Sequence, residues 1–378
     1  MKILYIIPLL MLALSCTSHP RSEENTGSSK FQKTTRGPVF TTDTLYKGFK
    51  NPWGMTWLPD GRMLVTERAG EILIFNKDKF TGQKLEGVPT VYKQGQGGLF
   101  DIQLHPKYKE NGWIYIAYAK PGPEGGSTAI MRFKLKGNAL TDQQEIFRTT
   151  PLTKSGAHFG GRIIFDKKGY LYFSSGERGT KPNSQDLGND LGKIHRIYDD
   201  GRIPQDNPFV GKAGARPSIW SYGHRNPQGM VYDSKNDIIW AHEHGAKGGD
   251  ELNLIEKGAN YGWPLTTYGV NYDGSVISEF KEKEGITKPV HYWVPSIAPC
   301  GMVLVTSDRY KGWKGNLLIG ALAKTHVARI QLKGKEFAGE EKLLENVGRV
   351  RCVAQSPDGY IYVLTEGSGL MLKLEPIR

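Results

Sequence analysis

The 378-residue chain has few cysteines and few stretches with helical periodicity. Three cysteines give no disulfide framework to interpret, and the length is sufficient for a sizeable apolar core. Apolar residues seldom recur at the spacing of an amphipathic helix. In contrast, 47 glycines, 18 tyrosines and 8 tryptophans favour short strands joined by tight turns. The composition therefore predicts an all-β protein.

Basic residues form no cluster, although the formal net charge is +12. Lysines and acids alternate, as in residues 281–284, and no zinc-finger, helix-turn-helix or RNA-recognition signature occurs. We therefore expect no nucleic-acid partner. A diffuse positive field instead favours an anionic ligand or surface.

An apolar run covers residues 3–14 and is followed by Ser15-Cys16. It is too short to span a bilayer as a stable helix and is typical of a signal-peptide core. We predict that residues 1–15 are a signal peptide and that the protein is exported to the periplasm. Residues 13–16 resemble a bacterial lipobox, although leucine is more usual where Ala13 stands. They predict lipid attachment of Cys16 and anchoring to the outer membrane. A plain secretory signal and an uncleaved anchor are the alternatives.

The next segment, residues 16–37, is polar and cannot bury enough apolar surface to fold. We expect it to be a flexible tether and residues 38–378 to form the folded domain. In an oxidising compartment Cys300 and Cys352 could pair, but the sequence does not decide this.

One turn-and-strand pattern recurs along the folded part, with an Asp-Gly, Asn-Gly or similar turn before an apolar strand. Such a turn between apolar runs is a strong hairpin signal. The copies cover residues 60–66, 111–117, 168–174, 235–241, 313–319 and 358–364. Six copies predict a six-bladed β-propeller of four-stranded antiparallel blades, with the ligand site at one mouth of the channel. A β-sandwich or a pair of barrels is the alternative.

A small-residue loop at residues 155–162 carries His158 directly before an apolar run. Glycines allow backbone to approach a ligand closely, and histidine is suited to removing a hydroxyl proton. His158 is thus a candidate general base, or else a hydrogen-bonded structural histidine.

Other polar loops also fall between the predicted blades. Residues 223–229 combine Arg225 and Asn226, which suit carboxylate binding, although a loop-stapling arginine is the alternative. Arg349 and Arg351 lie on one face if their segment is extended, an arrangement that favours an anion, and a surface ladder is the alternative. In residues 242–251, a His-x-His pair suits zinc or iron, and a glycine-rich acidic end suits Ca²⁺, which we favour.

Several segments together resemble one family. They are Pro52-Trp53-Gly54-Met55, Gly95-Gln96-Gly97-Gly98-Leu99, His158-Phe159-Gly160-Gly161-Arg162, residues 223–229, and Asn260-Tyr261-Gly262-Trp263-Pro264. In this order they resemble the soluble glucose dehydrogenase and aldose sugar dehydrogenase family, which uses pyrroloquinoline quinone (PQQ). The resemblance extends over residues 49–374 and implies a six-bladed propeller.

The resemblance also implies roles for individual residues. His158 would take the proton of the aldose C1 hydroxyl while the C1 hydride passes to PQQ, giving an aldonolactone. The matching cofactor-binding positions are Gln96, Arg225, Asn226, Tyr272, Leu322, Arg349 and Arg351. Gly245 and Ala246 match a turn that holds Ca²⁺ against the quinone, and Glu251 and Tyr261 match a second calcium site.

Two positions depart from the family pattern. The family often has a lysine that reaches the cofactor, whereas this chain has Ala323 there and Lys324 one position later. In a strand that shift would turn the lysine to the other face. Ala157 stands where some relatives carry aspartate, so the preferred sugar could differ from glucose.

We therefore predict a monomeric quinoprotein that oxidises aldoses and passes electrons to an unidentified periplasmic acceptor. Alternative functions on this fold are a sorbosone or polyol dehydrogenase, a calcium-dependent lactonase, and a non-catalytic propeller that binds glycans or proteins.

Overall fold

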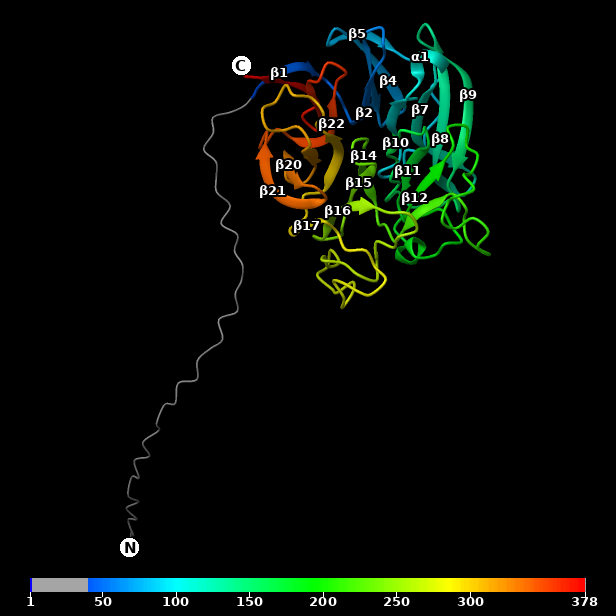
Figure 1. Ribbon diagram of the computed structural model, residues 1–378, viewed down its shortest axis with the longest axis vertical. Coiled ribbons are helices and arrows are strands. Elements are labelled where there is room, and N and C mark those ends of the chain that lie inside the picture. The colour runs from blue at the N-terminus through cyan, green and yellow to red at the C-terminus, as the bar shows by residue number, and fades with distance from the viewer. Residues whose placement is uncertain (2–39, 378) are drawn as a thin grey trace. The chain divides into compact units, whose positions relative to one another are not determined.

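The computed structural model describes residue 1 and residues 40–377, and the strands run from Phe40 to Pro376. The predicted signal peptide and tether lie outside the described residues, apart from Met1. In the described part, strands form six four-stranded antiparallel sheets in a propeller arrangement (Figure 1). None of the described helices is long and apolar enough to cross a membrane.

Blades 1 to 3 follow the chain in order. Blade 1 is β2 (Pro52–Trp57), β3 (Arg62–Glu67), β4 (Glu71–Asn76) and β5 (Lys79–Lys84). Blade 2 is β6 (Leu99–Leu104), β7 (Ile114–Gly122), β8 (Gly125–Lys136) and β9 (Ala139–Arg148), with the short helix α1 (Tyr108–Asn111) before β7. Blade 3 is β10 (Ile163–Phe165), β11 (Leu171–Ser175), β12 (Lys193–Ile197) and β13 (Ile219–Tyr222), with a 3₁₀ turn, η1 (Lys181–Ser184).

Blades 4 to 6 complete the ring. Blade 4 is β14 (Pro227–Asp233), β15 (Ile238–Glu243), β16 (Asp250–Ile255) and β17 (His291–Trp293). Blade 5 is β18 (Pro299–Leu304), β19 (Leu317–Ala321), β20 (His326–Lys333) and β21 (Glu336–Leu343). Blade 6 is β22 (Arg349–Gln355), β23 (Ile361–Glu366), β24 (Leu370–Pro376) and the first strand of the domain, β1 (Phe40–Lys47).

The six predicted turn-and-strand copies correspond to the second strand of each blade: β3, β7, β11, β15, β19 and β23. The propeller prediction is therefore confirmed. Closure of the ring was not predicted. β1 pairs antiparallel with β24 from Phe40↔Pro376 to Lys47↔Leu370, so the two ends of the domain share one sheet.

The core is divided among the junctions between blades. Six clusters of buried apolar side chains each join two neighbouring sheets. Leu64 of β3 and Ile116 of β7, for example, belong to one cluster and are both fully buried. Because each blade packs on both faces, the second strands have continuous apolar runs.

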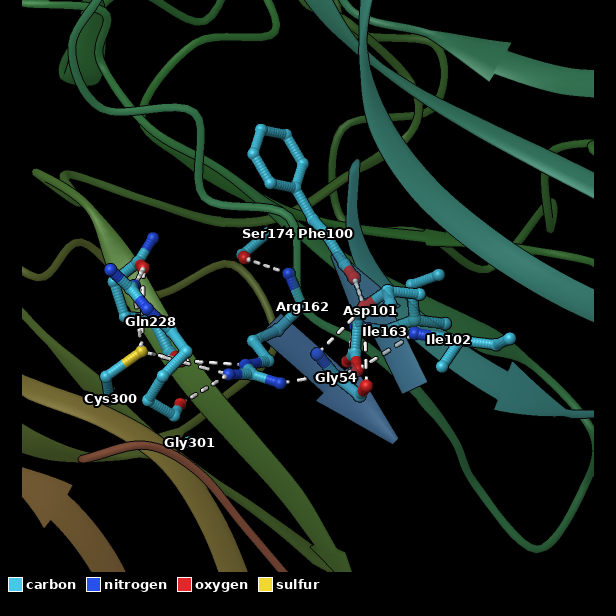
Figure 2. Close-up of polar contacts among 12 residues, drawn as sticks. Gly54, Phe100, Asp101, Ile102, Arg162, Ile163, Ser174, Gln228, Cys300 and Gly301 are labelled. Atoms are coloured by element: carbon cyan, nitrogen blue, oxygen red, sulfur yellow. Dashed lines mark hydrogen bonds and ion pairs between the residues drawn. The ribbon is translucent and has the colours of Figure 1, made fainter. Parts of the chain in front are cut away.

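One arginine connects the innermost strands (Figure 2). Arg162, directly before β10, is buried and donates from Nε to the Gln228 carbonyl at 2.8 Å and from Nη1 to Asp101 Oδ1 at 3.3 Å. Its guanidinium also lies 4.0 Å from the Trp53 ring centroid. The Nη2 atom donates to the Arg351 carbonyl at 3.4 Å and lies 3.8 Å from Cys300 Sγ. These partners belong to β2, β6, β14, β18 and β22. Arg162 therefore ties all six blades together at the centre of the ring.

Candidate active site

A cavity of about 420 Å³ lies among loops from several blades. It contains six of the seven predicted cofactor-binding residues: Gln96, Asn226, Tyr272, Leu322, Arg349 and Arg351. Its other lining residues are Trp53, Arg68, Phe100, Phe159, Gly160, Gln228, His244, Ala298 and Glu366. The propeller thus brings together residues that are up to 313 positions apart in the chain (Trp53 to Glu366).

His158 is held at the edge of this cavity by two contacts. Its backbone N–H donates to Gln96 Oε1 at 2.9 Å, and its Nδ1 lies 2.7 Å from Glu177 Oε1. An ionised carboxylate only accepts, so Nδ1 carries the proton and Nε2 of the neutral ring keeps its lone pair. No described residue bonds Nε2, and the adjoining Phe159 and Gly160 line the cavity. This is the tautomer that a general base needs.

The environment of His158 favours the neutral ring. Burial lowers the pKa of His158 below its ordinary value, and the positive charge of Arg225 acts in the same direction. The hydrogen bond to Glu177 offsets part of this shift. The side chain is 13% exposed. His158 is therefore a proton acceptor at neutral pH rather than a cation.

The backbone of the His158 loop is held in place by Arg178. The buried guanidinium of Arg178 donates to the carbonyls of Ser155 and Ala157 and lies 3.3 Å from the Phe159 ring centroid. His158 itself has φ of +50°, an uncommon conformation for a residue with a Cβ. The contacts on both sides of His158 hold this conformation.

Arg349 and Arg351 point to the same side, as predicted, but an internal anion already meets them. Arg351 Nε lies 2.7 Å from Glu366 Oε1, and Arg349 Nε lies 3.4 Å from Glu366 Oε2. The expectation that this pair needs an external anion was therefore incomplete. One carboxylate neutralises part of two guanidinium charges, and positive charge remains at the cavity wall.

A smaller pocket adjoins the cavity and shares His244 with it. It is lined by Arg225 and by three of the predicted calcium ligands, Gly245, Glu251 and Tyr261, whereas Ala246 is buried and does not line it. Burial raises the pKa of Glu251 well above its ordinary value, and the negative charge of Glu243 adds to this shift.

The His-x-His pair is oriented toward the backbone. His242 Nε2 lies 3.3 Å from the Gly301 carbonyl and His244 Nε2 lies 2.9 Å from the Pro299 carbonyl. Because a carbonyl accepts, both Nε2 atoms are donors and offer no lone pair to zinc. Among the described residues, no group of three or more His, Cys, Asp and Glu side chains converges as a metal site.

Comparisons with known proteins agree with this geometry. Residues 49–373 match the family model described as glucose/sorbosone dehydrogenase. The chain is 42% identical over 342 residues to an aldose sugar dehydrogenase of Escherichia coli (strain K12), covering 88% of this chain and 92% of that protein. The chain belongs to the glucose/sorbosone dehydrogenase family.

Two solved structures show the same architecture as this glucose/sorbosone dehydrogenase family member. The apo form of the soluble aldose sugar dehydrogenase of Escherichia coli aligns with a TM-score of 0.87 at 40% identity, covering 89% of this chain and all of that chain. The PQQ-bound form of an aldose sugar dehydrogenase from Streptomyces coelicolor aligns with a TM-score of 0.73 at 30% identity, covering 89% and 99%. The predicted resemblance is confirmed, and so is the interpretation of the chain as an enzyme.

One argument about the family lysine was wrong. Leu322 lines the cavity, but Leu322–Thr325 form a turn between β19 and β20 rather than a strand. The alternation of strand faces therefore does not apply to Lys324, which is exposed and does not line the cavity. Cys300 and Cys352 are both buried and unpaired, and burial raises the pKa of the Cys352 thiol to about 12.

Three residues of the site, Glu177, Glu366 and Arg68, were not predicted from the sequence. Glu177 follows Gly176, where a Cβ would come within 2.2 Å of the His158 carbonyl, so the glycine permits the close approach of the two loops. Glu366 ends β23 opposite Arg349, a register that only strand pairing reveals. Arg68 lines the cavity and donates from Nη1 to the Gly95 carbonyl at 2.9 Å. The one signal in the sequence was for Glu366, which stands at the end of the apolar run that forms β23.

Proposed function

We propose that the enzyme oxidises the C1 hydroxyl of aldoses to aldonolactones by hydride transfer to bound PQQ, with His158 as general base. The observation that carries this proposal is the His158–Glu177 pair beside a cavity lined by cations. A fixed imidazole with a free Nε2 is suited to accepting a hydroxyl proton. A purely binding propeller would need neither the pair nor its tautomer.

The charges of the cavity fit a polycarboxylate such as PQQ. Arg68, Arg349 and Arg351 line it, and Glu366 is the one acid among its lining residues. In the adjoining pocket Arg225 Nε is buried without a hydrogen-bond partner in the described part of the chain. Planar guanidinium groups suit bidentate binding of carboxylates. These arginines, with Asn226 and Gln96, would hold PQQ, which when bound accepts the hydride.

Calcium fits the adjoining pocket on different grounds. The buried carboxylates of Glu243 and Glu251 repel each other there, because the charge of Glu243 raises the pKa of Glu251. A divalent cation would relieve this repulsion, and oxygen donors are its preferred ligands. We propose that Glu251 and the Tyr261 carbonyl hold one Ca²⁺. The carbonyls of Gly245 and Ala246 would hold another beside PQQ, where it supplies a Lewis acid.

Other residues of the chain orient the base, stabilise its charged form and exclude water. Glu177 fixes the ring and tautomer of His158, and its charge stabilises the imidazolium that forms when the proton of the C1 hydroxyl arrives. Gln96 and Arg178 hold the loop backbone on either side of the base. Trp53, Phe100 and Phe159 give the cavity an apolar side that limits access of water.

Reconstitution of the purified protein with PQQ and Ca²⁺, followed by dye-linked oxidation of aldoses, tests the proposal. His158→Ala should lower kcat by roughly 10²-fold or more, the scale of lost general-base catalysis. The affinity for PQQ should change little, because arginines hold the carboxylates. His105→Ala is the matched control, since His105 is a buried histidine that packs against Phe165, outside the cavity. Lactone hydrolysis without dye reduction would instead support a lactonase. Near-parental turnover of His158→Ala would refute the role of the base.

A further inference from the structure

Exposed apolar side chains are concentrated in one segment of the chain. Apart from Met1 and Ile377, every large apolar side chain that is exposed among the described residues lies between positions 265 and 294. They are Leu265, Tyr272, Val276, Phe280, Tyr292 and Val294, with exposed fractions of 43% to 74%. Contiguous exposed apolar surface marks interaction sites more often than isolated residues do. We call this set the apolar patch.

Four residues of the patch belong to the long connection between β16 and β17, residues 256–290, which projects from blade 4 (yellow in Figure 1). The other two, Tyr292 and Val294, lie in β17 and directly after it. This connection returns to the cavity. Lys181 Nζ donates to Asn271 Oδ1 at 2.9 Å, Lys247 and Val270 form a bridge, and the next residue, Tyr272, lines the cavity. The apolar patch and the cavity therefore share one wall.

Lysines surround the cavity on the same side of the propeller. In antiparallel blades, the loops between second and third strands and those between blades lie on one face, which carries the cavity-lining residues Arg68, Gln96 and Leu322. We call it the mouth face. Its loops carry Lys50, Lys93, Lys154, Lys181, Lys247 and Lys324. None of these six forms an ion pair with a described residue, unlike Lys120, which pairs with Glu145.

The 256–290 connection itself is close to electrically neutral, because its four lysines are interspersed with five acids. The lysines that could attract an anionic partner are therefore those of the loops around the patch, which also carry the exposed acids Glu124, Asp186 and Glu345. Cations that are held apart and lack internal partners favour an acidic partner and accelerate its approach.

We propose that the apolar patch and the lysines of the mouth face dock an acidic one-electron carrier protein. This inference rests on the proposed function. Each aldose oxidation leaves two electrons and two protons in the site. Two carrier molecules each take one electron at their oxidised metal centre, and the protons pass to water. A carrier must come close to the cavity, and the patch is the apolar surface that adjoins it. An apolar centre with a charged rim is typical of transient redox complexes.

The test uses the holoenzyme and two soluble c-type cytochromes, one of strongly negative and one of strongly positive net charge. The reduction rate of each cytochrome with excess aldose is compared with the reduction of a small dye. The triple variant Lys50→Glu, Lys154→Glu, Lys324→Glu alters the mouth face. The matched control, Lys136→Glu, Lys168→Glu, Lys235→Glu, makes the same change in net charge at exposed positions of the opposite face.

We expect the acidic cytochrome to be reduced faster, with a rate that falls as salt rises. The mouth-face triple should slow it about tenfold or more at low salt, whereas the control should slow it less than about threefold, because steering raises association rates 10- to 10³-fold. Val276→Ser with Phe280→Ser should also slow the cytochrome reaction and leave dye reduction unchanged. In the mouth-face triple and in the Val276→Ser, Phe280→Ser variant, binding of the acidic cytochrome to the cofactor-free protein should weaken as the reduction rate falls.

Equal effects of the two triples would overturn the proposal, because the attraction would then come from net charge alone. A preference for the basic cytochrome would also overturn the proposal. The same holds if the mouth-face triple loses binding to anionic lipid vesicles but keeps its binding to the acidic cytochrome. If the parent protein fails to reduce the dye, the proposed function itself fails. Dye reduction without cytochrome preference refutes only the docking surface.

Discussion

Replacing Glu177 by glutamine tests the chemistry of the site most directly. The side chain is 2% exposed, Oε1 accepts from His158 Nδ1, and Oε2 has no partner in the described part of the chain. Glutamine keeps the shape and removes the charge. A hydrogen bond to a charged group contributes about 1.5–3 kcal/mol, so kcat should fall by about 10- to 150-fold. Glutamine can also donate to Nδ1, which would place the proton on Nε2 and block the base.

The pH dependence of kcat/KM in Glu177→Gln gives a second measurement, for which the direction of the change is predicted. Burial lowers the pKa of His158, and the bond to Glu177 raises it. Removing Glu177 removes the raising contribution, so the pKa of His158 falls further. The acidic limb of kcat/KM, measured by dye reduction in the reconstituted enzyme from pH 4 to 9, should therefore move to lower pH.

Glu340→Gln is the matched control. Glu340 accepts from Trp293 Nε1 at 2.8 Å and lies 3.6 Å from His291 Nε2, away from the cavity. This variant should keep the parental kcat and acidic limb. An acidic limb that stays in place, or moves to higher pH, in Glu177→Gln would refute the coupling between Glu177 and His158. Parental kcat in that variant would refute the proposed tautomer.

Three further predictions concern binding, metal and export. Arg351→Ala should weaken PQQ binding by about 2–5 kcal/mol, the scale for losing a buried charge partner. Arg349→Ala should weaken it by less, because the Arg349 side chain is 51% exposed and that of Arg351 is 12% exposed. Fluorescence titration of the apo protein with PQQ measures both losses, and equal losses would contradict the argument from burial. Chelation should abolish activity and raise the pKa of Glu251 relative to the calcium-loaded protein, with Ca²⁺ restoring activity better than Zn²⁺; restoration by Zn²⁺ alone would contradict the oxygen-ligand site. Cys16→Ala should release the protein from the membrane fraction into the soluble periplasmic fraction, and identical partitioning of variant and parent would show that Cys16 is not lipidated.

The sequence by itself determined the architecture, because the signals for it are local. Each of the six turn-and-strand copies requires only neighbouring residues to form its hairpin, and the number of copies gives the number of blades. The motifs around Gln96, His158 and Asn226 likewise identified loops whose glycines allow close approach of backbone. These residues then meet in the structure, with Gln96 bonded to His158 and both Gln96 and Asn226 at the cavity.

Contacts between distant segments were decided only by the tertiary structure. β1 closes the ring by pairing with a strand more than 300 positions later, which no local pattern encodes. Glu366 meets both arginines because β22 and β23 pair in one register, and a shift of one residue would turn it to the other face. Glu177 reaches His158 because the loop before β10 and the loop after β11 approach each other closely at Gly176. The burial that lowers the pKa of His158 likewise arises only when the blades pack together, since desolvation depends on every segment that surrounds the ring.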